Sequence, residues 1–427
     1  MSLVTAQAEP WQSARAAPLT LDKAGSALEL VIIMMTLLLF SQGLLGLLFV
    51  PKDAVHGPAW LRLLFYPFYL TTIAMIVMRP WSSINALTRS ILLLLPVLMA
   101  LVSVQWSIMP EATYRRAVAL MMTTVFAIYL ASRYDWADFI EVLASCFAIL
   151  ALMSLFMAVF VPSKGIMHET FPGAWSGIWY EKNDLGMNMA KAVHLFLCAM
   201  IFRPKRIWLW APFMVLALVL LLLSTSKTSL LAAFLGVSGV AALYIFRRGP
   251  LIGIPLVYFG VVLGVALALG VEYAPKFMFG LIGKDPTLTG RTDIWKALFD
   301  QIKHHPWFGH GYGVFWLDET GPAFWVRQRT QWLVPTAHNG WLETWLSIGL
   351  GGVILFAVAY ISTLAAALRG LLHGKAAYWA LISTLVFLLF SISESNILQQ
   401  NSLGWIVFAA TAAKLFGARP LHRAAAP

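Results

Sequence analysis

Arg291 and His338 carry side chains that could act on a phosphate-bearing substrate, and both belong to one stretch between two apolar runs. A helix is expected over residues 292–303, because apolar residues recur along one face, with Thr292 as its N-cap. Arg291 would then lie at the helix N-terminus, where unpaired N–H groups favour an anion and a guanidinium adds a two-pronged hydrogen bond. An alternative is that Arg291 pairs with Asp293 or reaches lipid phosphates.

His338 precedes an Asn-Gly turn at the start of the next apolar run. An imidazole has a pKa near neutral, so it can accept a proton or bind a phosphate oxygen. The alternative is an ordinary loop histidine. A metal site built from His304, His305, His310 and His338 is disfavoured by their irregular spacing and by the lack of an acidic ligand pattern. The sequence therefore predicts no metal and no cofactor.

A polar stripe follows a second aromatic loop, at about residues 162–184. Asp184, Asn188, Lys191 and His194 are spaced by four, three and three residues, which places them on one face of a helix. A charge at the bilayer centre costs about 2.5–3.5 kcal/mol, so such residues usually face a cavity or the interior of the bundle. The stripe predicts a hydrophilic cavity below the outer membrane surface.

Further polar groups are expected around the outer mouth of the same cavity. Lys227 lies in the turn 224–229, a second polar turn covers 393–401, and Arg115 and Arg116 precede another apolar run. Each of the two turns could be only a solvated turn, which is the more common case.

The composition indicates what positions these residues. The chain is 60% apolar and 11% charged, whereas soluble domains carry about 25% charged residues. The net charge of +11 then reflects excess Lys and Arg in cytoplasmic loops, not nucleic-acid binding. Cys146 and Cys198 lie within apolar runs, so no disulfide or cysteine metal site is expected.

We expect an all-α polytopic membrane protein with about twelve transmembrane helices, since about 20 apolar residues cross a bilayer. Residues 1–271 would hold helices 1–9, residues 272–337 one large periplasmic loop with short helices, and residues 338–427 helices 10–12. Basic residues are more frequent on the side of the termini, which predicts cytoplasmic termini. The expected spans are 28–50, 60–78, 90–106, 117–131, 139–161, 185–202, 207–223, 229–246, 251–271, 341–366, 376–392 and 403–417.

Three motifs together resemble the O-antigen ligase and Wzy-type polysaccharide polymerase superfamily. They are 289–295 (TGRTDIW), 306–313 (PWFGHGYG) and 337–343 (AHNGWLE). Residues 181–186 (EKNDLG) and 226–229 (SKTS) are similar to the ExoQ-type exopolysaccharide polymerase branch. Glu181 stands where that branch usually has His. Lys227 stands where ligases tend to have Arg, which favours a polymerase.

The resemblance implies an inverting, metal-independent glycosyltransferase of the bacterial inner membrane with a periplasmic active site. It would polymerise oligosaccharide repeat units carried on undecaprenyl pyrophosphate. His338 and Arg291 would be catalytic, and Glu343 and Asp293 are further candidates for the base. The substrate would be bound by Lys227, Lys182, Asn183, Lys191, Arg115, Arg116 and Asn339.

Two alternatives stay open. An O-antigen ligase would transfer the lipid-linked glycan to lipid A core instead of to another glycan. A transporter or flippase would also span the membrane about twelve times, but it predicts inverted repeats with broken helices near the midplane, which the sequence does not suggest. The expected partners are the lipid-linked donor, a glycan or lipid A core acceptor and the bilayer. A chain-length regulator or an export complex would be a further partner, and nucleic acid none.

Overall fold

The computed structural model describes residues 23–49, 58–169, 171–246, 291–318, 320–331, 333–371 and 374–417. Within these ranges the chain is helical and contains no strand, which confirms the all-α fold class. The expected span 251–271 and residues 272–290 of the large loop lie outside the described residues. The helices are α1 (Lys23–Phe40), α2 (Leu45–Phe49), η1 (Ala59–Phe65), α3 (Tyr66–Val77), α4 (Pro80–Arg89), α5 (Ile91–Val102), η2 (Ser103–Trp106), α6 (Pro110–Arg133), α7 (Trp136–Phe160), α8 (Pro162–Gly165), α9 (Lys182–Phe202), η3 (Pro204–Arg206), α10 (Ile207–Leu223), α11 (Lys227–Phe246), α14 (Arg291–Ile302), α15 (Pro322–Thr330), α16 (Gly340–Gly370), α17 (Ala376–Ser393) and α18 (Leu403–Gly417).

Among the described residues, eight helices are long and apolar enough to cross a membrane. A ninth span would be the pair Pro80–Arg89 and Ile91–Trp106, which is bent by 84°. Gly25–Phe40 and Leu403–Gly417 are apolar but shorter. The expected total of twelve spans stays a prediction, as does the side of the membrane on which the large loop lies.

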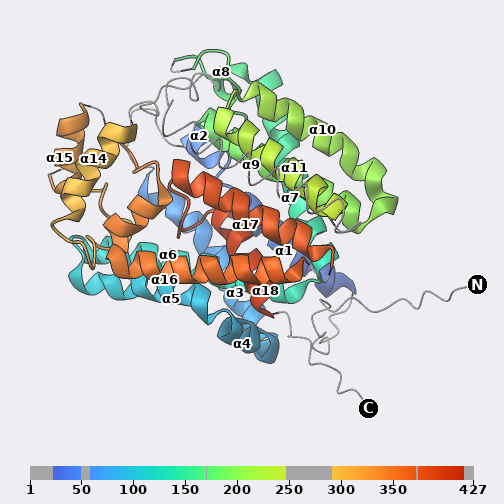
Figure 1. The fold of residues 1–427 in the computed structure, drawn as a ribbon, viewed down its shortest axis with the longest axis horizontal. Coiled ribbons are helices and arrows are strands. Elements are labelled where there is room, and N and C mark those ends of the chain that lie inside the picture. The colour runs from blue at the N-terminus through green and yellow to red at the C-terminus, as the bar shows by residue number, and fades with distance from the viewer. Residues whose placement is uncertain are drawn as a thin grey trace, which may run out of the picture.

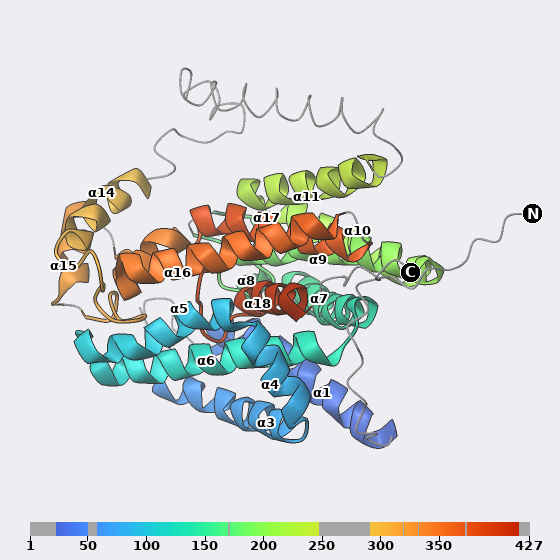
Figure 2. The ribbon, with the colours of Figure 1, turned by 60° about the horizontal axis from the view of Figure 1, so that its bottom comes forward.

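The helices form one bundle, with α14 and α15 gathered at one end beside the start of α16 (Figures 1 and 2). A hydrophobic cluster holds this end together, and its fully buried members include Leu298, Phe315, Val326 and Leu346. The apolar face expected on residues 292–303 is confirmed in part, because Ile294, Leu298 and Ile302 are buried whereas Phe299 is exposed. The helix begins at Arg291, however, so Thr292 belongs to its first turn and is not the N-cap.

Helix α16 is interrupted near its beginning. Ile348 and Gly349 have non-helical backbone angles, and Gly349 has a φ of 71°. The loop 306–313 occupies the interruption. The Leu350 N–H donates to the Pro306 carbonyl oxygen at 2.9 Å, and the His310 N–H donates to the Leu346 carbonyl oxygen at 2.8 Å. The loop therefore satisfies backbone groups that the break removes from the helical ladder.

Glycine is required where this loop and α16 meet. A Cβ at Gly349 would lie 2.1 Å from the Trp307 carbonyl oxygen, and a Cβ at Gly309 would lie 2.7 Å from the Leu346 carbonyl oxygen. Both residues also have positive φ, which disfavours any residue with a side chain. The glycines of the motif 306–313 thus allow two backbones to approach closely.

Candidate active site

Glu394 joins Arg291 to His338. The Arg291 guanidinium donates to the Ser393 carbonyl oxygen and to Glu394 Oε1, the latter at 3.0 Å. His338 Nδ1 lies 3.4 Å from the other carboxylate oxygen, Oε2. The three side chains are 20–23% exposed, so water reaches them only in part. The two residues expected to be catalytic therefore meet at one carboxylate. Along the chain, Glu394 is 103 residues from Arg291 and 56 residues from His338.

The electrostatics of Glu394 favour its charged form. Burial alone would raise the pKa of this carboxyl group. The hydrogen bond to His338 and the charge of Arg291 outweigh burial, so the pKa of Glu394 lies below its ordinary value. A charged carboxylate beside His338 Nδ1 favours a proton on that nitrogen, which leaves Nε2 as the ring atom with a lone pair.

The backbone around His338 is set by the start of α16. His338 has a φ of 47°, in the left-handed region. The next residue, Asn339, is the N-cap, and its side-chain oxygen accepts from the N–H groups of Trp341 at 3.0 Å and Leu342 at 3.1 Å. The side-chain oxygen of Asn339 thus fixes the helix start, and its expected contact with substrate stays a prediction.

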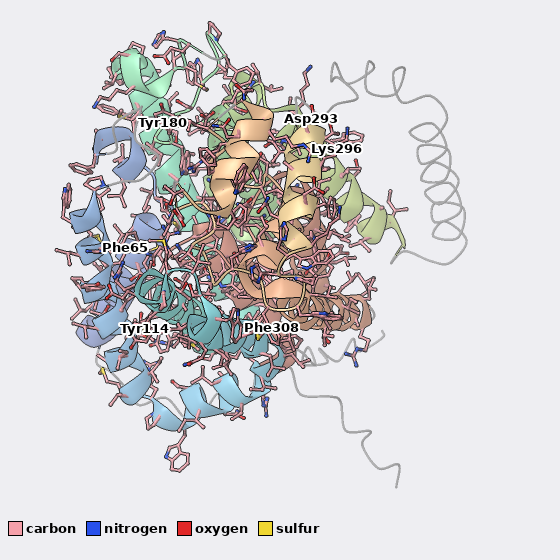
Figure 3. The ribbon with its side chains drawn as sticks, turned by 90° about the vertical axis from the view of Figure 1, so that its left-hand side faces the viewer. Phe65, Tyr114, Tyr180, Asp293, Lys296 and Phe308 are labelled. Carbon is pink, nitrogen blue, oxygen red and sulfur yellow. The ribbon has the colours of Figure 1, made fainter. Side chains whose placement is uncertain are left out.

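Glu343 is partly buried and accepts hydrogen bonds from three segments. Its donors are the Ala337 N–H at 2.8 Å, Trp316 Nε1 at 2.9 and 3.1 Å, and Ser395 Oγ at 3.3 Å. Asp293 lies on α14 in an exposed ion pair with Lys296, at 3.6 Å (Figure 3). Among the described residues Arg291 pairs with Glu394, so the alternative ion pair with Asp293 is not formed.

Arg115 and Arg116 are neighbours in α6 but have different surroundings. Arg116 donates to the Gly313 carbonyl oxygen at 2.7 Å and lies within electrostatic range of Glu343. Arg115 is about half exposed and pairs with Glu111 on its own helix at 3.7 Å. The structure thus brings Arg116 to the large loop and leaves Arg115 at the surface.

The beginnings of α9 and α11 form a second, cationic side of the site. Lys182 begins α9 and Lys227 begins α11, and their ammonium groups are close enough to repel each other. Lys182 Nζ donates to Thr225 Oγ1 at 3.2 Å, and Ser226 Oγ donates to Asn183 Oδ1 at 3.1 Å. Two helix N-termini and two ammonium groups at one place favour an anion.

Glu181 lies between the two sides. It is within electrostatic range of Lys182 and also of Glu394 and His338. Burial and repulsion by Glu394 raise the pKa of Glu181, while His338 and Lys182 oppose the shift. Asp184, about one helical turn after Glu181, also interacts electrostatically with Glu394. The start of α9 therefore faces the Arg291–Glu394–His338 cluster.

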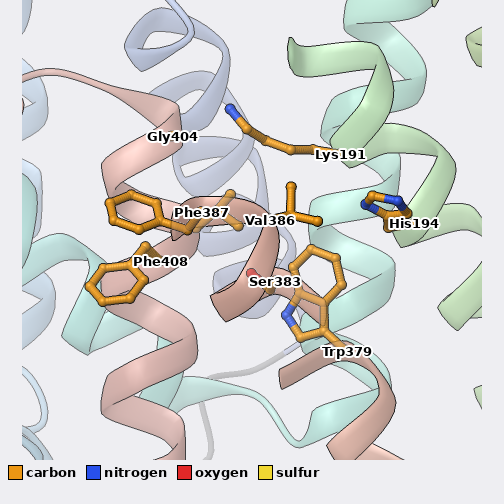
Figure 4. A pocket seen from close by; sticks show the side chains of 9 residues that line it. Lys191, His194, Trp379, Ser383, Val386, Phe387, Gly404 and Phe408 are labelled. Carbon is orange, nitrogen blue, oxygen red and sulfur yellow. The ribbon is translucent and has the colours of Figure 1, made fainter. Parts of the chain in front are cut away.

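The polar stripe of α9 is directed into the bundle, as expected from its spacing. Asn188 Nδ2 donates to the Asp184 carbonyl oxygen at 2.9 Å, and a His194 ring nitrogen lies 3.2 Å from the Ala233 carbonyl oxygen of α11. Lys191 and His194 border a cavity of about 20 Å³, among mainly apolar side chains (Figure 4). That space holds about one water. At this depth Lys191 and His194 thus border a small and mainly apolar space, and the expected hydrophilic cavity stays a prediction.

Glu394 was not among the expected site residues. The only signal in the sequence was a polar turn, 393–396, between two apolar runs. Nothing in that turn shows which cation or imidazole its carboxylate will meet, since both partners come from distant segments.

Comparison with known proteins gives two matches. Residues 212–357 match the family model described as O-antigen ligase, a range that includes Lys227, Arg291 and His338. The chain is also 28% identical over 291 residues to the exopolysaccharide production protein ExoQ of Rhizobium meliloti (strain 1021), covering 64% of this chain and 64% of that protein. The chain thus spans less than two thirds of the length of this relative. The resemblance to O-antigen ligases and to the ExoQ-type branch, as the motifs predicted, is confirmed.

Proposed function

Because the chain resembles O-antigen ligases and is a multi-pass membrane protein, we propose that it is an inverting glycosyltransferase that uses a glycan carried on undecaprenyl pyrophosphate. It polymerises oligosaccharide repeat units into a cell-surface polysaccharide. One observation carries the proposal: Glu394 binds both Arg291 and His338. We further propose that this site lies on the periplasmic side of the inner membrane.

The cationic side of the site suits the diphosphate of the donor. Lys182 and Lys227, at the beginnings of α9 and α11, supply two positive charges and the positive ends of two helix dipoles. Arg291 adds a guanidinium whose orientation is set by Ser393 and Glu394. These groups stabilise the negative charge that develops on the leaving pyrophosphate.

The His338–Glu394 pair suits proton removal from the acceptor. His338 Nε2 accepts the proton of the acceptor hydroxyl, while Nδ1–H stays hydrogen-bonded to Glu394. The hydroxyl oxygen forms a bond to the anomeric carbon, on the face opposite the pyrophosphate, and the bond to the pyrophosphate oxygen breaks. The bonding electrons leave with the pyrophosphate, so the anomeric configuration is inverted.

An O-antigen ligase is the second candidate, because the family model that matches carries that description. Lys227 and the similarity to an exopolysaccharide production protein favour the polymerase. The two are separated by incubating the purified protein with a defined lipid-linked repeat unit and resolving the products by size. A ladder of lengthening products supports the polymerase, and a single transfer onto lipid A core supports the ligase. Formation of neither product by a protein that is folded would refute the proposed function.

The residue assignments are tested in the same assay. Arg291→Ala and His338→Ala should abolish transfer while the proteins insert normally into the membrane. Near-wild-type activity of either variant would show that its residue has another role.

A further inference from the structure

The Glu343 carboxylate lies beside His338 and Glu394, which we call the catalytic pair, without belonging to that pair. It accepts from the N–H of Ala337, which directly precedes His338. It also accepts from the hydroxyl of Ser395, which directly follows Glu394. The indole N–H of Trp316, from the large loop, donates to both of its oxygens.

From this geometry we infer that Glu343 is a positioning residue that sets the distance and orientation between His338 and Glu394. The inference rests on the proposed function. We call the four residues Trp316, Ala337, Glu343 and Ser395 the Glu343 clamp. Each member of the catalytic pair is the covalent neighbour of one clamp residue, so a shift of either neighbour is passed directly to the pair.

The need for such a hold follows from the backbone of His338. Its φ of 47° is a conformation that residues other than glycine rarely adopt, and it persists only where surrounding contacts enforce it. On the C-terminal side, the Asn339 cap fixes the chain. On the N-terminal side, the Ala337 N–H bond to Glu343 fixes it. His338 is thus held from both directions.

The same contacts argue against Glu343 as the general base. Oε2 accepts from Ala337, Ser395 and Trp316, and Oε1 accepts from Trp316, so both carboxylate oxygens are already held by donors within the protein. The charged or titratable groups within electrostatic range include Arg116 and His338. A base must instead present a lone pair to the acceptor hydroxyl, which His338 Nε2 does in the proposed function.

Two substitutions at Glu343 separate the roles. In Glu343→Gln the carboxamide oxygen can take the place of Oε2 and accept from all three donors, although the amide nitrogen then faces the Trp316 N–H. A positioning residue should therefore keep kcat within about tenfold of wild type in this variant. Glu343→Ala leaves the donors unpaired, and a misplacement of about 1 Å lowers kcat about 100-fold. For both variants the donor KM should stay within about threefold.

Hydrogen exchange provides a readout that does not depend on transfer. The backbone amides at 336–338 and 394–396 should exchange faster in Glu343→Ala than in wild type, and at nearly the wild-type rate in Glu343→Gln. Glu111→Gln is the matched control, since Glu111 is an exposed carboxylate that forms an ion pair with Arg115 on its own helix, at 3.7 Å. It should change neither exchange nor kcat.

The outcomes divide cleanly. If Glu343→Gln abolishes transfer as fully as Glu343→Ala while its amide exchange stays normal, Glu343 acts chemically and the inference is overturned. Unchanged exchange in Glu343→Ala would also overturn it, because no clamp would exist. A wild-type protein without transfer activity would refute the proposed function instead, and the exchange comparison would still decide whether the clamp holds the segments.

Discussion

Replacing Glu394 with Gln should disable His338 through a change of tautomer. Arg291 can only donate hydrogen bonds, so the carboxamide oxygen will face its guanidinium, which now lies 3.0 Å from Oε1. The carboxamide nitrogen then faces His338 Nδ1, at the place of Oε2. Nδ1 must accept that bond, so the ring proton moves to Nε2. The atom that should receive the acceptor's proton no longer has a lone pair.

The magnitude follows from the loss of general-base catalysis, which contributes about 100- to 10,000-fold to a rate. We therefore expect Glu394→Gln to lower kcat by about 100-fold or more. The donor KM should change by less than about threefold, since Lys182 and Lys227 are untouched. The assay is the initial rate of chain lengthening with a defined lipid-linked repeat unit, at several donor concentrations.

Glu111→Gln serves as the matched control for Glu394→Gln, because it removes a carboxylate that is 92% exposed. Thermal unfolding in detergent must show that both variants are folded. A Glu394→Gln enzyme with kcat within threefold of wild type would refute the argument that Glu394 orients His338. A large rise in donor KM at constant kcat would instead assign the cluster to donor binding.

Three other predictions concern stability and charge. The pKa of Glu394 is lowered by folding, so its contribution to stability is complete above about pH 4.5 and is lost as the pH falls through the lower pKa of the folded state. Unfolding temperatures should therefore decline less steeply below pH 5 in Glu394→Gln than in wild type. Gly349→Ala should destabilise the protein by more than about 1–3 kcal/mol because of its positive φ and the clash with the Trp307 carbonyl, whereas Gly351→Ala, whose Cβ would meet nothing closer than 3.6 Å, should unfold near the wild-type temperature. Lys227→Arg should retain transfer and Lys227→Gln should lose at least about tenfold in kcat/KM if charge matters there; equal activity of all three proteins would exclude Lys227 from phosphate binding.

The apolar runs predicted most of the long helices, because a bilayer demands long apolar segments, but the expected span 28–50 is divided into α1 and α2. They did not predict the break in α16, since Gly349 lies in a run that stays apolar on both sides. The partner of that break, the loop 306–313, is supplied by tertiary structure. Arg115 and Arg116 were likewise indistinguishable in the sequence, because adjacent helix residues point about 100° apart and only packing decides which one is buried.

The same limit applies to the candidate site. The motifs identified Arg291 and His338, which have functional groups unusual in an apolar chain. Glu394 and the role of Glu343 depend on which distant residues become neighbours. The tertiary structure determines which side chains contact a carboxylate, so a single sequence shows the carboxylate but not its partners.

The break in α16 also bears on where the site would lie relative to the hydrocarbon core of a membrane. The whole helix, Gly340–Gly370, would be about 46 Å long at about 1.5 Å per residue, which exceeds a hydrocarbon core of about 30 Å. The part after the break, residues 350–370, is about 31 Å long and matches that core by itself. Glu343 and the Asn339 cap would therefore stand above the acyl chains, level with the lipid phosphates. Under the proposed function, this position would bring the site to the level at which a lipid-linked diphosphate presents its sugar.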